Sequence, residues 1–321
     1  MRNISLNVRA NVVVAADLDP QRRSAIGRQY PQVAIEPDAE DVIEDGEVDA
    51  VVIATPISSH HDIAMRALKN GKHVLVAKPM ASSSGEAEAM TSLAEELGLQ
   101  VLVDHTFLYT GAVECMKRLI DAGDLGDIYY FDSVRVNLGL VQPDVNVVWD
   151  LAAHDFAILR YLFDALPTEV QAVAAKRAGR SFEDVAYVSA FFDDGMIAHL
   201  HVNWLSPVKV RMTLVGGSRK MLAWDDLASD EKIKVYDRGI DVSDEDREGV
   251  YQKLVAYRMG DIWIPQLERQ EALAKEVDHF IDCIEGHDTP RTGAGFGTEI
   301  VRLLEATDRS ILEGGTRVPV R

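Results

Sequence analysis

The chain has 321 residues and a formal net charge of −19, from 33 lysines and arginines against 52 aspartates and glutamates. This acidic balance argues against sequence-independent binding to nucleic acid, which depends on neutralising phosphates, and against binding to anionic membranes. No apolar run approaches the roughly 20 residues that span a bilayer, and no secretory signal is visible, so we expect a cytoplasmic protein.

The first part of the chain, residues 1–107, alternates short apolar runs with amphipathic stretches. Near-continuous apolar strands separated by helices predict a parallel sheet that is covered on both faces, the α/β class. The expected strands are Val12–Ala16, Ala50–Ala54, His73–Val76 and Gln100–Val103. The expected helices are Pro20–Tyr30, Ser59–Asn70 and Ser84–Leu97, the last two ended by Gly71 and Gly98.

The second part, residues 108–321, has the pattern of an α+β domain with an open, mainly antiparallel sheet. The stretch "DVAYVSAFFDDGMIAHLHVNWL" predicts a hairpin that turns at Asp193-Asp194-Gly195. A second strand pair is expected around Gly216-Gly217, and the acidic stretch Asp225–Pro265 is expected to include a long loop. The expected helices are Ala112–Ala122, Leu267–Glu285 and Gly297–Glu313.

Polar residues follow each predicted strand of the first domain. In a parallel sheet the carboxyl ends of all strands lie along one edge, and ligands bind there. The residues at these ends are Asp17 and then the stretches "ATPISSHH", "AKP" and "DHTF". This arrangement favours a cofactor site at that edge.

Asp17 bears on the choice of cofactor. A carboxylate at this place can hydrogen-bond an adenosine ribose and repel a 2′-phosphate, which favours NAD over NADP. The alternative is an acid that stabilises the start of the next helix. Arg22 and Arg23 weaken this preference, because a nearby arginine can accept the additional phosphate. The alternative is that both are surface residues of the following helix.

Lysine and histidine supply the candidate catalytic groups. Pro79 stops a strand behind Lys78, and a lysine at a strand tip can stabilise the charge that develops on an alkoxide. The alternative is an exposed lysine that happens to precede a proline.

Asp150 and His154 are four residues apart, so the carboxylate can orient a histidine that removes a proton from an alcohol. The alternative is a helix-terminal acid beside a solvated histidine.

No metal site is expected. His60 and His61 are adjacent and would point apart on a helix, and His199 and His201 share a strand face without a third ligand. Cys115 and Cys283 lack the spacing of a metal-binding or redox motif, so we expect free thiols.

Four stretches together resemble the Gfo/Idh/MocA family of oxidoreductases. They are "VVVAADLDPQRR", "VDAVVIATPISSHHDIAMRALKNGKHVLVAKPM", "GDLGDIYYFDSVRVN" and "WDLAAHDFAILRYL", in the family's order within residues 12–163. The resemblance implies a Rossmann domain that binds NAD(P) and hydride transfer at a sugar or polyol carbon. It also implies a C-terminal domain whose open sheet forms a dimer or tetramer.

The resemblance also implies roles for individual residues. Lys78 matches the lysine of the family's E-K-P motif, and Asp150 and His154 match its D-x-x-x-H motif, with His154 as acid and base. The cofactor-binding residues expected are Asp17, Leu18, Thr55, Pro56, His60 and Lys78. The branch that acts on nucleotide sugars, notably UDP-N-acetylglucosamine 3-dehydrogenases, is the most similar. The substrate-binding residues expected are then Lys78, Arg135, Asn137, Asp150 and His154.

The chain departs from the family pattern in two places. Ala77 stands where the family has the glutamate of E-K-P. Met1–Arg9 resembles the end of the helix that follows a G-x-G-x-x-G turn, and the strand and turn themselves are absent upstream of Val12. We expect a truncated or mis-started sequence that lacks roughly 15–25 residues. Two alternative functions stay open: a dehydrogenase or reductase of free sugars or inositols, and a non-catalytic nucleotide sensor or scaffold.

Overall fold

The computed structural model describes residues 1–44, 46–139, 144–178, 181–242 and 255–321. Their contacts form two compact units. Unit 1 comprises Met1–Tyr109 and Gln270–Glu305, and unit 2 comprises Thr110–Arg269 and Ala306–Arg321. The sequence analysis assigned all residues after 107 to the second domain, whereas the contacts return Gln270–Glu305 to the first.

Packing explains that difference. Helix α8 (Ala272–Ile284) buries Phe280 and Cys283 against Leu75 and Leu102 of the parallel sheet. A shared apolar core therefore joins segments of unit 1 that are far apart in sequence.

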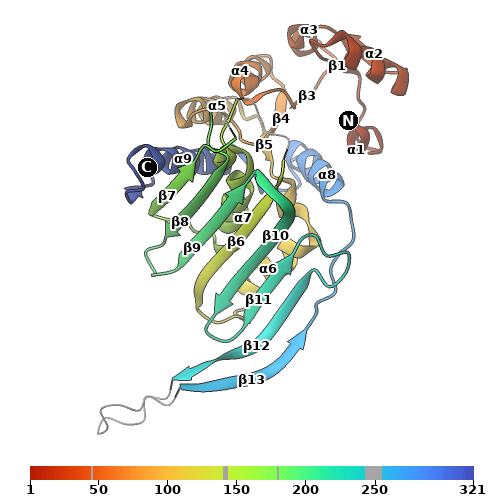
Figure 1. Cartoon of the computed structure of the whole chain (residues 1–321). Helices are drawn as coiled ribbons and strands as arrows, with labels where there is room; N and C mark the ends of the chain where they lie inside the picture. The colour runs from red at the N-terminus through yellow and green to blue at the C-terminus, as the bar shows by residue number, and fades with distance from the viewer. Residues whose placement is uncertain (45, 140–143, 179–180, 243–254) are drawn as a thin grey trace. The chain divides into compact units, whose positions relative to one another are not determined.

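Unit 1 is built on parallel strands that form two separate sheets (Figure 1). The first sheet pairs β1 (Val14–Ala16) with β2 (Ala34–Glu36), and the second has the order β3 (Ala50–Ile53), β4 (His73–Ala77), β5 (Val101–Asp104). The helices are α1 (Arg2–Ser5), α2 (Pro20–Gln29), α3 (Ala39–Glu44), α4 (His60–Lys69), α5 (Ser84–Leu97), α8 and the first part of α9 (Ala294–Leu312).

The division of the parallel sheet lies between β1 and β3. No hydrogen-bonded pairing joins these two strands in the described part of unit 1. Strand β2 and helix α3, which are short and only partly buried, were not predicted from the sequence.

Local signals account for the helix boundaries. Ser83 lies before the first turn of α5, and its hydroxyl accepts a hydrogen bond from the Glu86 amide at 3.3 Å. Gly98 follows the last turn with a φ of 65°, a left-handed conformation that favours glycine. The predicted range Ser84–Leu97 is confirmed.

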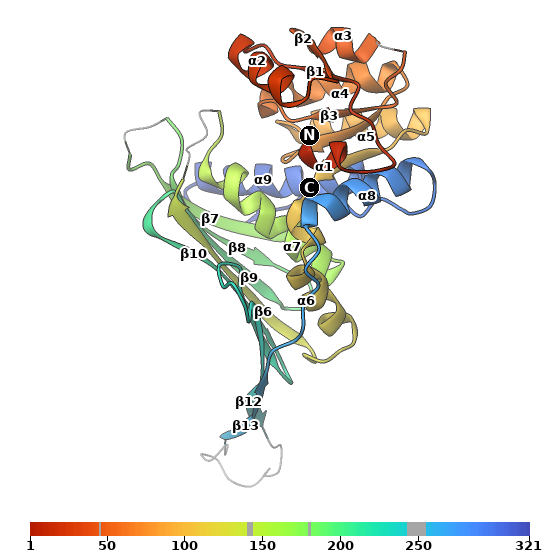
Figure 2. The same cartoon turned by 90° about the vertical axis from the view of Figure 1, so that its right-hand side faces the viewer.

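Unit 2 is a nine-stranded mixed sheet with the order β13-β12-β11-β10-β6-β9-β8-β7-β14. Helices α6 (Gly111–Asp121) and α7 (Ala153–Phe163) lie on one face, as Figure 2 shows. The strands are β6 (Ile128–Leu138), β7 (Glu169–Ala175), β8 (Val185–Phe191), β9 (Ile197–Asn203), β10 (Leu205–Gly217), β11 (Met221–Asp225), β12 (Ile233–Val242), β13 (Val255–Trp263) and β14 (Val318–Pro319).

Burial alternates along these strands. In β9, Ala198, Leu200 and Val202 are fully buried, whereas Ile197, His199 and His201 on the other face are not. A one-sided core of this kind is typical of an antiparallel sheet with one open face. The predicted hairpin is confirmed as β8–β9. No helix among the described residues is both long and apolar enough to cross a membrane.

Asp225–Pro265 contains the paired strands β12 and β13, which were not predicted from the sequence. Residues 243–254 of this stretch, in which a long loop was expected, lie outside the described residues. The second predicted strand pair is confirmed as β10–β11. Gly216 and Gly217 end β10, and the turn spans residues 218–220. A Cβ on Gly216 would lie 2.1 Å from the Tyr130 ring, and one on Gly217 would lie 2.3 Å from the Leu125 carbonyl oxygen. These glycines therefore permit close packing.

Candidate active site

The carboxyl ends of β3 and β4 are joined by a buried histidine. His60 begins α4 and is 1% exposed. Its Nε2 lies 2.8 Å from the Thr55 carbonyl oxygen and its Nδ1 lies 3.0 Å from the Pro79 carbonyl oxygen. His60 therefore ties the loop after β3 to the loop that carries Lys78, while Thr55 and Pro56 are exposed. This geometry favours a positioning role for His60 over direct contact with a cofactor.

Lys78 and His105 directly follow the neighbouring parallel strands β4 and β5. Ala77 of β4 and Asp104 of β5 are register partners in the parallel sheet, so the residues that follow them start side by side. The Lys78 ammonium is close enough to His105 to help lower the pKa of that imidazole. Lys78 itself is half-buried, and the Lys78–Pro79 peptide bond is cis.

His105 and Glu276 form a buried polar cluster that the sequence analysis missed. Burial lowers the pKa of His105 to about 4, and its ring packs edge-on against Phe296 with centroids 5.6 Å apart. Burial, followed by the charge of Asp104 and a hydrogen bond with it, raises the pKa of Glu276 to about 9. Thr106 Oγ1 donates to Glu276 at 3.2 Å. At neutral pH the cluster therefore holds a neutral imidazole and a protonated carboxyl group.

Of the two residues His105 and Glu276, only His105 lies in a sequence pattern that could have indicated it. His105 stands in the polar stretch "DHTF" that follows β5, although its residue type suggested no specific role. Glu276 is on α8, about 170 residues from its partners, and no spacing rule connects it to them.

Asp17 directly follows β1, which belongs to the other sheet of unit 1. One carboxylate oxygen accepts the Asp19 amide at 2.8 Å, and the other lies 3.7 Å from Nη1 of Arg22. Arg23 donates instead to the Asp17 and Leu18 carbonyls, at 2.6 and 3.0 Å. Of the two arginines that the sequence left open, Arg22 is therefore the one that faces the Asp17 carboxylate. Leu18 is 84% exposed.

In unit 2, Asp150 and His154 lie where a π-helical turn meets an α-helix. The turn, η3, spans Val148–Ala152, and α7 begins at Ala153. Such π turns occur often at functional sites. Trp204 Nε1 donates to Asp150 Oδ2 at 3.0 Å, so the carboxylate is held from the β9–β10 junction. Both Asp150 and His154 are half-buried.

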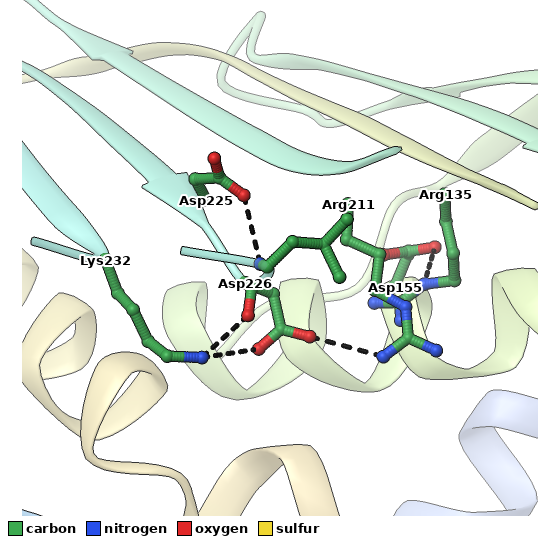
Figure 3. A network of polar contacts seen from close by, with 7 residues as sticks. Arg135, Asp155, Arg211, Asp225, Asp226 and Lys232 are labelled. Atoms are coloured by element: carbon green, nitrogen blue, oxygen red, sulfur yellow. Dashed lines mark hydrogen bonds and ion pairs between the residues drawn. The ribbon is translucent and has the colours of Figure 1, made fainter. Parts of the chain in front are cut away.

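Arg135 is placed differently from its expected role as a substrate contact. Its guanidinium makes two hydrogen bonds to Asp155, Nε to Oδ2 at 3.0 Å and Nη2 to Oδ1 at 2.9 Å (Figure 3). Ser133 Oγ donates to the same carboxylate at 2.9 Å. Arg135 is 3% exposed and Asp155 is 0% exposed, so the pair belongs to the interior between β6 and α7. Contact between Arg135 and a substrate stays a prediction that this burial disfavours.

The ion-pair network continues on the neighbouring strand. Arg211 is the register partner of Arg135, and its Nη1 lies 3.2 Å from Asp226 Oδ2. Lys232 Nζ donates to the Asp226 carbonyl at 2.6 Å (Figure 3). The two acids therefore offset the repulsion between adjacent cations on the covered face of the sheet.

Asn137 lies nearer to the Asp150 turn. A Cβ built on Gly139 would be 3.0 Å from both Asn137 Nδ2 and Trp204 Cδ1, so these two side chains flank the same glycine. Asn137 therefore stands beside the tryptophan that holds Asp150, and its expected contact with substrate stays a prediction.

Metal-ligand geometry is confined, among the described residues, to one surface group: Asp282, Glu285 and His287. Arg9 already pairs with both acids, at 2.8 Å to Asp282 and 2.5 Å to Glu285. His201 stacks on Tyr187 with ring centroids 4.4 Å apart, on the open face of the sheet. The cysteines are free and buried.

Two family models match the chain. The model described as the oxidoreductase family with an NAD-binding Rossmann fold matches residues 2–105, and the GFO/IDH/MocA C-terminal domain matches residues 113–222. The chain belongs to the Gfo/Idh/MocA family of oxidoreductases. Unit 1 contains its NAD-binding Rossmann fold, as the resemblance in sequence predicted.

Individual relatives are named for sugar and polyol oxidation. The scyllo-inositol 2-dehydrogenase (NAD(+)) of Bacillus subtilis is 31% identical over 166 residues, 50% of this chain and 48% of that protein. The UDP-N-acetylglucosamine 3-dehydrogenase of Acidithiobacillus ferrooxidans is 27% identical over 249 residues, 75% of this chain and 72% of that protein. The chain spans about half the length of two of the curated relatives it matches.

Solved structures agree on the fold. The WlbA dehydrogenase of Bordetella pertussis, crystallised with NADH and UDP-GlcNAcA, has a TM-score of 0.78 at 20% identity. The alignment covers 98% of this chain and 91% of that one.

NAD fits the residues of unit 1 at its two ends. Asp17, partly exposed after β1, offers a carboxylate to ribose hydroxyls. Thr55 and Lys78 offer a hydroxyl and an ammonium group at the carboxyl ends of β3 and β4. Residues 1–13 contain no glycine-rich turn for the pyrophosphate, so the fit concerns the adenosine and nicotinamide ends alone.

Proposed function

We propose that this protein transfers a hydride between NAD and a sugar carbon, with C3 of a UDP-amino sugar as the reacting position. The observation that carries the proposal is the Asp150–His154 motif, with its carboxylate held by a buried indole, in a chain whose other unit is an NAD-binding Rossmann fold. Lys78 at the carboxyl edge of that fold supplies a cation for an oxygen that becomes negative.

Each residue has a defined part in the proposed reaction. In the oxidative direction His154 takes the hydroxyl proton, and the Asp150 carboxylate stabilises the imidazolium that results. The Lys78 ammonium stabilises the alkoxide while the carbonyl group forms. NAD⁺, when bound, would supply the hydride acceptor, and the products would be a ketone, NADH and one proton.

The substrate class rests on relatives. A UDP-N-acetylglucosamine 3-dehydrogenase matches three quarters of this chain, and a structural neighbour is described with UDP-GlcNAcA. The inositol dehydrogenase matches half of it, so a free polyol is the second substrate to test.

A homo-oligomer is part of the proposal. The open face of the unit 2 sheet exposes apolar side chains that include Val173, Tyr187 and Ile197. Burial of such side chains against a second copy would remove them from water.

The decisive experiment incubates the protein with NAD⁺ and each of UDP-N-acetylglucosamine, its uronic acid and scyllo-inositol, with NADH absorbance as the readout. We expect turnover with a UDP-sugar and loss of turnover in Lys78→Met. Turnover with the inositol alone would overturn the substrate class. No turnover with any of the three, in a chain that binds NAD⁺, would overturn the proposed function.

A further inference from the structure

The turn that carries Asp150 is hydrogen-bonded to a helix that is far away in sequence. Asp308 lies on the part of α9 that belongs to unit 2. Its Oδ1 accepts Asn146 Nδ2 at 2.8 Å, and its Oδ2 accepts Trp149 Nε1 at 2.7 Å. Both oxygens of one carboxylate are thus engaged by residues that closely precede Asp150.

The Asn146 side chain, which Asp308 orients, is hydrogen-bonded to the backbone of the turn. Its Oδ1 accepts the amides of Val148 and Trp149, at 3.0 and 3.1 Å. Its carbonyl oxygen accepts the Asp150 amide at 3.2 Å. The first amides of the turn are therefore held by one side chain, whose own orientation Asp308 determines.

A second restraint acts on the Asp150 side chain. Trp204 donates its indole N–H to Asp150 Oδ2 at 3.0 Å and is 2% exposed. Its backbone is also fixed, because its amide donates to the Asp184 carbonyl at 2.9 Å. The indole that donates to Asp150 therefore belongs to a buried residue whose backbone is itself hydrogen-bonded.

We propose that Asp308 and Trp204 are positioning residues for the Asp150–His154 pair: Asp308 fixes the backbone of the π turn, and Trp204 fixes the Asp150 carboxylate. Acid-base catalysis needs this degree of restraint, since a displacement of about 1 Å can cost on the order of 10²-fold in rate. The catalytic meaning of the pair rests on the proposed function, whereas the restraint on the turn does not.

The hydrogen-bond pattern allows a test by exchange of residues. Asp308→Asn places an amide N–H₂ against a donor, so one of the two bonds is lost. In the double variant Asn146→Asp/Asp308→Asn all bonds can form again. The new amide on α9 donates to the new carboxylate before the turn and accepts the Trp149 indole N–H. That carboxylate still accepts the two backbone amides.

Ser310 provides a matched control on the same helix. It is 0% exposed, and its hydroxyl accepts the Ala172 amide at 2.8 Å and donates to the Thr316 carbonyl. Ser310→Ala therefore removes buried hydrogen bonds of unit 2 without touching the Asp150 turn.

We expect Asp308→Asn and Trp204→Phe to lower kcat by roughly 10- to 100-fold with little change in substrate KM. The double variant should regain most of the lost kcat. Ser310→Ala should lower the melting temperature and leave kcat near wild type. Two outcomes would overturn the positioning role. One is a double variant as slow as Asp308→Asn. The other is a Ser310→Ala variant whose kcat falls in proportion to its loss of stability.

A second readout needs no turnover. Long-range ¹H–¹⁵N spectra of the histidine rings report which nitrogen of His154 carries the proton. We expect Asp308→Asn and Trp204→Phe to change the His154 tautomer ratio, and the double variant and Ser310→Ala to keep that of wild type. Unchanged His154 spectra in all variants would overturn the inference. If wild type turns over no substrate while these spectra change as expected, the proposed function alone fails.

Discussion

Arg135 on β6 and Asp155 on α7 form a two-point ion pair in the interior of unit 2, with N–O distances of 3.0 and 2.9 Å. Asp155 directly follows His154 in α7. The ion pair therefore fixes the first turn of the helix that carries the candidate base. Ser133 donates to the same carboxylate, which brings its hydrogen bonds to three. A buried ion pair of this kind is strongly destabilising when one of its partners is removed.

Removal of one partner of this pair should destabilise the protein strongly. Arg135→Met leaves Asp155 buried without its cation, and such losses cost about 3–5 kcal/mol in the free energy of unfolding. Urea denaturation measures the difference. Arg302→Ala is the control, because its pair with Glu88 is exposed and worth about 1 kcal/mol or less. Equal losses in the two variants would contradict a structural role for the buried pair.

Replacement of His154 by asparagine should abolish most of the proposed turnover. Asparagine keeps polarity but cannot take a proton near neutral pH, so kcat should fall by about 10²–10⁴-fold. NAD affinity, measured by calorimetry, should change little. His287→Asn removes an exposed histidine and serves as the control. Turnover of His154→Asn near that of the control would exclude this histidine as the base.

The preference for NAD should depend on the balance between Asp17 and Arg22. Asp17→Ser removes the charge that repels a 2′-phosphate, so the ratio of kcat/KM for NAD to that for NADP should fall. Arg22→Ala removes the cation that lies 3.7 Å from Asp17 and should raise the same ratio. A wild-type preference for NADP would show that the arginine dominates.

Because of Glu276, stability should fall as pH rises from about 4.5 to about 9. Its folded pKa is raised to about 9 from an ordinary 4.5, so between these values the folded chain binds more protons than the unfolded chain. The free energy of unfolding then declines with pH by at most about 1.4 kcal/mol per unit. Glu276→Gln should remove the decline measured by denaturation between neutral pH and about pH 9.

His105 should act in the opposite sense at lower pH. Its folded pKa is lowered to about 4 from 6.5, so the unfolded chain binds more protons between these values and stability rises with pH there. The two effects oppose each other up to about pH 6.5, and above it Glu276 acts alone. His105→Gln should steepen the decline in stability below that point. A flat profile in both variants and in wild type would contradict the buried cluster.

Local patterns explain what the sequence could predict of the fold. Helix α5 has its capping serine, its glycine end and its apolar positions within one short stretch, and the prediction matched it. Strands β12 and β13 pair on either side of residues 243–254, and the acidic, poorly periodic sequence of this stretch favoured a loop instead. Gly216 and Gly217 look like turn residues, whereas Tyr130 and Leu125, which require them, are far away in sequence.

The same distinction applies to the candidate site. Lys78 follows a strand, and Asp150 and His154 are one turn apart, so short-range rules were enough to single out all three as candidates. Glu276, Trp204 and Asp308 act on partners that are between 54 and 170 residues away, and no pattern of spacing reports such contacts.

Arg135 shows a different limit of sequence reasoning. Resemblance suggested a substrate contact, but the alternation along β6 places Phe131, Ser133 and Arg135 on the covered face of the sheet. A charged residue at such a position needs an internal partner, and Asp155 on α7 provides it.

Helix α9 has a consequence for how the protein is made. It runs from Ala294 to Leu312, and the division between the two units falls within it, after Glu305. On the ribosome, a nascent chain that stops before residue 294 therefore lacks packing surface for both units. We infer that neither unit completes its fold until α9 has left the exit tunnel. The long N-terminal part is therefore synthesised while its apolar sheet faces still lack the packing that α9 provides.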